Sequence, residues 1–153
     1  MSIDESGFAT RLVSRVAEEA EDDRLETARI IIAGGRGPGG PEGFKLLEEL
    51  ASSVGGAVGA SRVACDLGWC PHSRQIGMSG KTVTPDLYVA VGISGASHHM
   101  AGCGTAKAIL AINSDPDAAI FREARFGIVS DYKLIIPALI EALTEGDPCG
   151  VGN

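Results

Sequence analysis

Short apolar runs that end in glycine-rich loops restrict the fold of this chain more than any other feature. Residues 28–33 form a β-branched run that stops at Gly34. Residues 87–93 form a second apolar run, and Ser94 lies at the start of the loop that ends it. Continuous apolar runs of this length, bounded by turn residues, are typical of strands buried on both faces of a parallel sheet. In such sheets the loops after the strands share one edge, where ligands bind.

Helical patterns alternate with these runs. Apolar residues recur at helical spacing from Phe44 to Val54, after Pro41, which suits a first helical turn, and before a glycine pair. We also expect strands at Ala57–Ala60, Ala108–Asn113 and 127–129, and an irregular stretch at 66–75. One further helix should open at Ser94, and two others should cover 118–124 and 134–143. This alternation predicts an α/β fold in which a parallel sheet lies between two layers of helices.

Composition and charge limit the kind of protein. The 153 residues are 44% hydrophobic and 22% charged, which is ordinary for one soluble domain. A net charge of −7 argues against a nucleic-acid surface, which needs clustered lysine and arginine. Because no apolar run is as long as a membrane span and the start lacks a signal-peptide pattern, we expect a cytoplasmic protein. We expect a polar leader or linker at 1–26, the folded domain at 27–146 and a disordered tail at 147–153.

The cysteines do not have the spacing of a metal site. The chain has Cys65, Cys70, Cys103 and Cys149, without a C-x-x-C pair. A zinc ion can be imagined at Cys65, Cys70 and His72, or at His99 and Cys103. The spacing favours small buried or half-exposed thiols in a reducing compartment instead, so we expect no metal site.

Six motifs follow one another along the chain. They begin at Gly34, Pro41, Gly59, Gln75, Pro85 and Ala111, and read Gly-Gly-Arg-Gly, Pro-x-Gly-Phe-x-Leu-Leu-x-x-Leu-Ala, Gly-Ala-Ser-Arg-x-x-x-Asp-x-Gly-Trp, Gln-x-Gly-x-x-Gly-Lys, Pro-x-Leu-Tyr-x-Ala-x-Gly-Ile-Ser-Gly-Ala and Ala-Ile-Asn-x-Asp-Pro. Over about residues 25–143, this order closely resembles the FAD-binding C-terminal domain of the electron transfer flavoprotein α-subunit. The resemblance implies a three-layer, parallel-sheet nucleotide-binding fold, the deoxyhypusine-synthase-like NAD/FAD-binding domain, with FAD held in extended form.

The resemblance also implies a function. It implies an electron carrier and not a substrate-converting enzyme, relaying electrons from acyl-CoA or other flavin dehydrogenases to a downstream acceptor. The implied partner is a β-type subunit of electron transfer flavoprotein. The family's large N-terminal domain is absent from this sequence, so closure of the flavin site by self-association is the alternative.

The resemblance assigns a set of cofactor-binding residues and no catalytic ones. Its members are Arg36 near the pyrophosphate or flavin edge, Ser61 and Arg62 with the arginine over the isoalloxazine, Gln75, Met78 and Ser79 along the ring and ribityl chain, Gly92, Ser94, Gly95 and Ala96 around the phosphate, His98 and His99 at the pyrimidine edge, and Asn113 and Asp131 at the adenosine end. Met78 and His98 stand where the family usually has glutamine.

Physical chemistry supports three of these roles. A helix that begins at Ser94 would offer unpaired N–H groups to a pyrophosphate. A fixed Arg62 guanidinium, or a protonated or donating His99, would stabilise the negative charge of reduced flavin.

Two other functions stay open on this fold. An NAD-dependent enzyme would need a nucleophile or a general base, for which Lys81 and His98 are the only candidates, and neither has an evident partner in the sequence. A flavin-free scaffold subunit is the second alternative.

Overall fold

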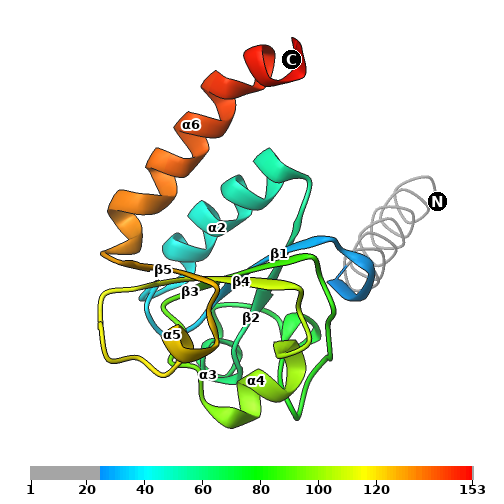
Figure 1. Ribbon diagram of the computed structural model, residues 1–153. Coiled ribbons are helices and arrows are strands. Elements are labelled where there is room, and N and C mark those ends of the chain that lie inside the picture. The colour runs from blue at the N-terminus through cyan, green and yellow to red at the C-terminus, as the bar shows by residue number, and fades with distance from the viewer. Residues whose placement is uncertain (1–24, 153) are drawn as a thin grey trace, which may run out of the picture.

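The computed structural model describes residues 25–152, with side chains described as far as Leu143. Five strands form one parallel sheet in the order β2-β1-β3-β4-β5 (Figure 1). They are β1 (Ile30–Gly34), β2 (Ala57–Ala60), β3 (Leu87–Val91), β4 (Ala108–Asn113) and β5 (Phe126–Val129). The predicted parallel α/β sheet is therefore confirmed, and β2 and β5 are its edge strands.

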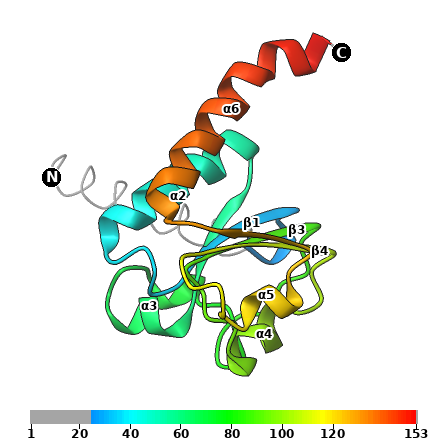
Figure 2. The ribbon, with the colours of Figure 1, turned by 60° about the vertical axis from the view of Figure 1, so that its left-hand side comes forward.

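Helices lie on both faces of the sheet. They are α2 (Pro41–Val54), α3 (Arg62–Asp66), α4 (Ser97–Cys103), α5 (Ile120–Glu123) and α6 (Tyr132–Gly152), with a short 3-10 helix, η1 (His72–Arg74). Figures 1 and 2 show α2 and α6 on one side of the sheet and α4 and α5 on the other. Within the described residues, no helix has the length and apolar character that crossing a bilayer requires.

Alternate residues of each strand fill two separate cores. Ile32 and Val89 point to the α2 face, where Phe44 and Leu47 pack on them. Their strand neighbours Ile31, Ala33, Tyr88 and Ala90 point to the opposite face, where Ile120 of α5 and Cys103 of α4 join them. Burial of both faces explains why these strands read as continuous apolar runs.

Several element limits differ from the sequence expectation. The helix expected to open at Ser94 begins at Ser97, because Gly92 and Gly95 take φ angles of +63° and +88°, which an α-helix does not contain. The stretch 66–75 is not wholly irregular, since α3 and η1 occupy its ends. The backbone of α6 continues past residue 143 into 147–152, where we expected a disordered tail.

The expected leader at 1–26 lies mostly outside the described residues. Leu25, at its end, is buried in the core that faces α4 and α5. The folded part therefore reaches at least to Leu25, and the other domain limits stay predictions.

Candidate functional site

Loops from all five strands share one edge of the sheet. Because the strands are parallel, their carboxyl ends lie on the same side. Arg36 follows β1, Ser61 follows β2, Ser94 follows β3 and Asp131 follows β5, whereas Asn113 is the last residue of β4. Residues assigned to the cofactor therefore follow or end every strand.

The loops after β1 and β3 touch through their backbones. A Cβ added to Gly37 would lie 2.5 Å from Gly92 Cα, and one added to Gly35 would lie 2.6 Å from the Gly92 carbonyl oxygen. The Gly37 N–H donates to that carbonyl at 3.2 Å. Side chains at these positions would force the two loops apart, so the glycines are needed for the close approach.

A cleft of about 710 Å³ opens beside this contact, over β3, β4 and β5. Of the residues that the motifs assign, it is lined by Arg36, Gly92, Ser94, Ala96, Asn113 and Asp131. The lining residues that sequence reasoning missed include Ser114, Asp115, Asp117, Ser130, Tyr132 and Lys133. Each of these six residues lies within four positions of Asn113 or Asp131, so proximity to the ends of β4 and β5 was the signal that could have found them.

Two of the assigned residues hold the cleft walls. The Asn113 Nδ2 group donates to the Ile93 carbonyl oxygen at 3.0 Å, and its Oδ1 accepts from the Asp115 N–H at 2.9 Å. Asp131 Oδ1 accepts from the Lys133 N–H at 3.0 Å. Asn113 thus ties the loops after β3 and β4 together, and Asp131 caps the start of α6.

The start of α6 is also tied to the loop after β1. The Tyr132 hydroxyl donates to the Pro38 carbonyl oxygen at 2.8 Å. This bond joins segments far apart in the sequence, and it fixes the distance between two walls of the cleft.

Charge is unevenly distributed along the cleft. The Arg36 side chain is exposed and forms no ion pair or hydrogen bond with the described residues. Asp115, Asp117 and Asp131 line the part at β4 and β5. One end of the cleft therefore suits an anion, and the other suits hydroxyl groups that donate to carboxylates.

A second group of assigned residues lies on the loop that follows η1 and on α4. The Gln75 side chain is buried, and its Nε2 donates to Ser79 Oγ at 2.9 Å. The Met78 N–H donates to the His98 carbonyl oxygen at 2.7 Å, which joins the loop to α4. The Met78 side chain is 66% exposed. These residues form one wall, separate from the cleft lining.

His99 is buried and neutral. Its Nε2 lies 2.7 Å from the Tyr88 hydroxyl, and its Nδ1 has no hydrogen-bond partner among the described residues. Burial lowers the pKa of His99 from 6.5 to about 4. The nearby Ile76 carbonyl opposes this shift, although it does not meet hydrogen-bond geometry at Nδ1. Of the two forms that we considered for His99, the structure favours the neutral, donating ring over the protonated one.

Ser61 and Arg62 begin α3 and do not line the cleft. Ser61 Oγ accepts from the Ala64 N–H at 3.4 Å and so caps the helix. The Arg62 side chain is 68% exposed, and its Nε lies 3.5 Å from Asp66 one turn later. Val63 and Leu67 are also exposed on α3. In this structure Arg62 is a surface residue beside an exposed apolar helix face.

The sequence also raised Lys81 as a residue of an NAD-dependent enzyme, and cysteines and histidines as metal ligands. Lys81 Nζ lies 3.9 Å from Glu26 Oε1, so it has an acidic partner. Across the described residues, no three histidine, cysteine or acidic side chains are grouped to hold a metal. Cys65, Cys70 and Cys103 are buried free thiols, as expected, whereas Cys149 lies beyond the described side chains.

Similar proteins identify the family. Residues 24–104 match the family described as "Electron transfer flavoprotein FAD-binding domain". The chain is 50% identical over 141 residues to electron transfer flavoprotein subunit alpha of Thermoanaerobacterium thermosaccharolyticum, covering 92% of this chain and 43% of that protein. The corresponding subunit of Bacillus subtilis is 53% identical over 126 residues, covering 82% and 39%. The mitochondrial subunit of Arabidopsis thaliana is 46% identical over 142 residues, covering 93% and 39%.

The chain thus spans about two fifths of the length of these curated relatives. The match extends over more than half of the chain and includes β1, β2 and β3 with the loops that follow them. It confirms the resemblance that the sequence motifs indicated, and the chain belongs to the electron transfer flavoprotein FAD-binding domain family.

Proposed function

We propose that this chain binds FAD along the carboxyl edge of its sheet and acts as an electron carrier. The strongest support is the cleft over β3, β4 and β5, because six residues that the resemblance assigns to the cofactor line it together. A polar cleft at the carboxyl ends of parallel strands is a usual place for a nucleotide. The family match supports FAD as that nucleotide.

The charges in the cleft suggest which way the nucleotide lies. Arg36 suits the pyrophosphate, because an exposed guanidinium favours an anion. Asp115 and Asp131 would accept from ribose hydroxyls, since a carboxylate is a good acceptor but repels phosphate. The adenosine end would then lie at β4 and β5.

The flavin end would lie at the loop that carries Gln75 and Ser79. Ser79 Oγ accepts from Gln75 and is exposed, so its own proton can be donated to the edge of a ring. Burial raises the pKa of Tyr88, so its hydroxyl keeps a proton to donate to His99 Nε2 and leaves the imidazole proton on Nδ1. That unpaired Nδ1 donor fits a histidine held for an acceptor atom of a ligand. Bound FAD would supply the reversible uptake of electrons.

The proposed partners follow from the relatives. A β-type subunit, or a second copy of this chain, would cover the flavin end, and flavin dehydrogenases such as those acting on acyl-CoA would donate electrons. The exposed Met78 and Leu67 side chains support a covering surface, because exposed apolar groups gain from burial. A cytoplasmic location belongs to the same proposal.

The absorbance spectrum of the purified full chain, before and after titration with FAD, tests the proposal. We expect a flavin spectrum and quenching of flavin fluorescence that saturates with added FAD. Consumption of NAD without bound flavin would favour an NAD-dependent enzyme. Absence of flavin binding, with and without a β-type subunit, would leave only the scaffold function.

A further inference from the structure

Cys65 and Cys70 are brought together by the turn that ends α3. The Leu67 N–H donates to the Val63 carbonyl at 3.0 Å, and the Trp69 N–H donates to the Ala64 carbonyl at 3.0 Å. These bonds reverse the chain, so that Cys70 returns to the end of the helix. Cys65 Sγ lies 3.5 Å from the Pro71 carbonyl oxygen, next in sequence to Cys70, and is within hydrogen-bond reach of the Cys70 sulfur.

The two thiols share one buried environment. Cys65 is 2% exposed and Cys70 is 7% exposed, and both belong to the core between the sheet and α2. Neither lines the nucleotide cleft, and neither is among the residues assigned to the cofactor. The pair is therefore separate from the nucleotide cleft.

We propose that Cys65 and Cys70 form a reversible disulfide, with a small disulfide such as glutathione disulfide as the oxidant. The turn fixes both sulfur atoms side by side, which is the arrangement that lets an internal thiol displace the small molecule.

The reaction balances in two exchanges. The Cys70 thiolate attacks one sulfur of glutathione disulfide, and the S–S bond breaks to release one glutathione thiolate. The Cys65 thiol then loses its proton and attacks the Cys70 sulfur of the mixed disulfide, which releases the second glutathione. The protein loses two hydrogens in total, and the oxidant is reduced to two thiols.

The surroundings of the two thiols decide which one attacks the oxidant and which one completes the disulfide. A side-chain hydrogen bond with Cys65 lowers the pKa of Cys70, and the Arg74 charge lowers it further, against the effect of burial. The same hydrogen bond and burial raise the pKa of Cys65. Cys70 is therefore the attacking thiolate, and Cys65 is the thiol that completes the bond.

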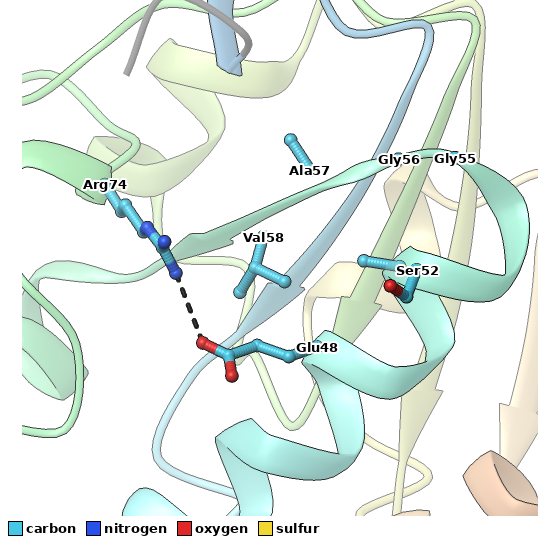
Figure 3. A pocket seen from close by; sticks show the side chains of 8 residues that line it. Glu48, Ser52, Gly55, Gly56, Ala57, Val58 and Arg74 are labelled. Carbon is cyan, nitrogen blue, oxygen red and sulfur yellow. Dashed lines mark hydrogen bonds and ion pairs between the residues drawn. The ribbon is translucent and has the colours of Figure 1, made fainter. Parts of the chain in front are cut away.

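A pocket lies at the β2 edge, and Arg74 links it to Cys70. It has a volume of about 330 Å³ and is lined by Glu48 and Ser52 of α2, by Val58 of β2 and by Arg74 (Figure 3). The Arg74 Nη1 group lies 3.3 Å from Glu48 Oε1, and the Arg74 side chain also hydrogen-bonds the Cys70 sulfur. Cys70 itself does not line the pocket, so a small disulfide bound there reaches the Cys70 sulfur when the Arg74 side chain moves aside.

Redox incubation of the purified full chain tests the proposal. The protein is incubated with mixtures of glutathione and its disulfide, quenched with acid, alkylated, and mapped by peptide mass spectrometry. We expect a Cys65–Cys70 disulfide that dithiothreitol reverses. Burial raises the pKa of Cys103 from 9.0 to about 11, so a smaller fraction of Cys103 than of Cys70 is thiolate. Although a low-pKa thiolate is less nucleophilic, Cys70 should still react at least about tenfold faster than Cys103.

Single variants separate the roles, with Cys103→Ser as the matched control. Cys65→Ser should accumulate glutathione on Cys70, because no thiol remains to displace it. Cys70→Ser should leave Cys65 largely unmodified, and Cys103→Ser should form the disulfide as the wild type does.

Two results in the folded wild type would overturn the proposal, whether or not the variants fold. One is that Cys65 and Cys70 both remain free thiols in excess glutathione disulfide. The other is that Cys70 ends as a stable mixed disulfide or pairs with a different cysteine.

Discussion

The two halves of the carboxyl edge offer a ligand different surroundings. Over β3, β4 and β5 an open cleft of about 710 Å³ is lined by loop backbone and by polar side chains. Around α3 and the loop after η1, the assigned residues bind neighbouring side chains instead, as Gln75 binds Ser79 and Arg62 pairs with Asp66. The first half, the nucleotide half, presents a cavity. The second half, the flavin half, presents one wall with exposed apolar residues.

This difference suggests which half is complete. The nucleotide half has walls on several sides, held by the Asn113 and Tyr132 hydrogen bonds. The flavin half leaves Met78 and Leu67 in solvent, where a tricyclic ring would keep one apolar face exposed. We expect the first half to depend on this chain alone, and the second to depend on another protein surface.

The largest effect should come from Gly92→Ala, which breaks the nucleotide half. The new Cβ would lie 2.5 Å from Gly37 Cα, at a residue with φ of +63°. A left-handed conformation costs about 1–2 kcal/mol and overpacking about 1–3 kcal/mol, so the free energy of unfolding should fall by about 2–5 kcal/mol. FAD affinity should fall as well, because the contact between the loops after β1 and β3 is lost. Urea denaturation and FAD titration measure the two losses.

Gly55→Ala is the matched control. Gly55 has a similar φ of +67°, but an added Cβ would find nothing within 4 Å. The free energy of unfolding of this variant should fall only by the cost of the left-handed backbone, about 1–2 kcal/mol, and its FAD affinity should stay unchanged. Equal losses in the two variants would show that the approach of the two loops contributes nothing.

The second largest effect should be a pH dependence of the free energy of unfolding caused by His99, the buried residue of the flavin half. The folded state lowers the pKa of His99 from 6.5 to about 4, so it favours the neutral ring. The resulting stability is fully present above pH 6.5 and is lost as the pH falls through that interval to about 4. At about 1.4 kcal/mol per pKa unit, the loss should reach about 3 kcal/mol.

His99→Gln should remove this pH dependence, because glutamine does not titrate. His98→Gln is the control, since His98 is the exposed neighbour on the same helix. The free energy of unfolding is measured by urea denaturation at each pH for the wild type and both variants. If His99→Gln follows the wild-type curve in parallel, His99 is not held neutral by burial.

Local sequence patterns were sufficient to predict the sheet. β3 and β4 read as continuous apolar runs because both of their faces are buried, so no alternation hides them. The helix start after β3 was not predictable in the same way. The positive φ angles at Gly92 and Gly95 depend on contacts with the loop after β1 and with α5, which are distant in the sequence.

The site residues were predictable as a set but not in their contacts. The resemblance assigned Asn113 and Asp131, and the cleft brings them together with Arg36. No motif indicated that His99 would meet Tyr88 across the core, or that Tyr132 would bond to Pro38, because such contacts arise only when distant elements pack. The thiol pair at Cys65 and Cys70 was likewise hidden, since it depends on the turn after α3.

The third effect tests whether the flavin half needs a partner. If a β-type subunit covers about 60 Å² of the apolar flavin face that this chain leaves exposed, the gain is about 1.5 kcal/mol, or roughly tenfold in FAD affinity. Linkage requires that FAD raise the affinity for the subunit by the same factor. FAD titration of the full chain, with and without the subunit, measures the first factor. Equal affinity and equal shielding of flavin fluorescence in the two titrations would show that this chain closes the site alone.

The smallest effect should come from Arg62→Ala. Because the side chain is 68% exposed and its ion pair with Asp66 is screened by solvent, its contribution to the free energy of unfolding should be below about 1 kcal/mol. FAD affinity and the potential of the bound flavin should fall, with the affinity changing by less than about fivefold. Arg29→Ala is the matched control, since Arg29 is an exposed, ion-paired arginine at the opposite end of β1. If the two variants have the same FAD affinity and flavin potential, Arg62 does not contact the ring. A loss far above fivefold would instead show that Arg62 leaves Asp66 to bind the flavin.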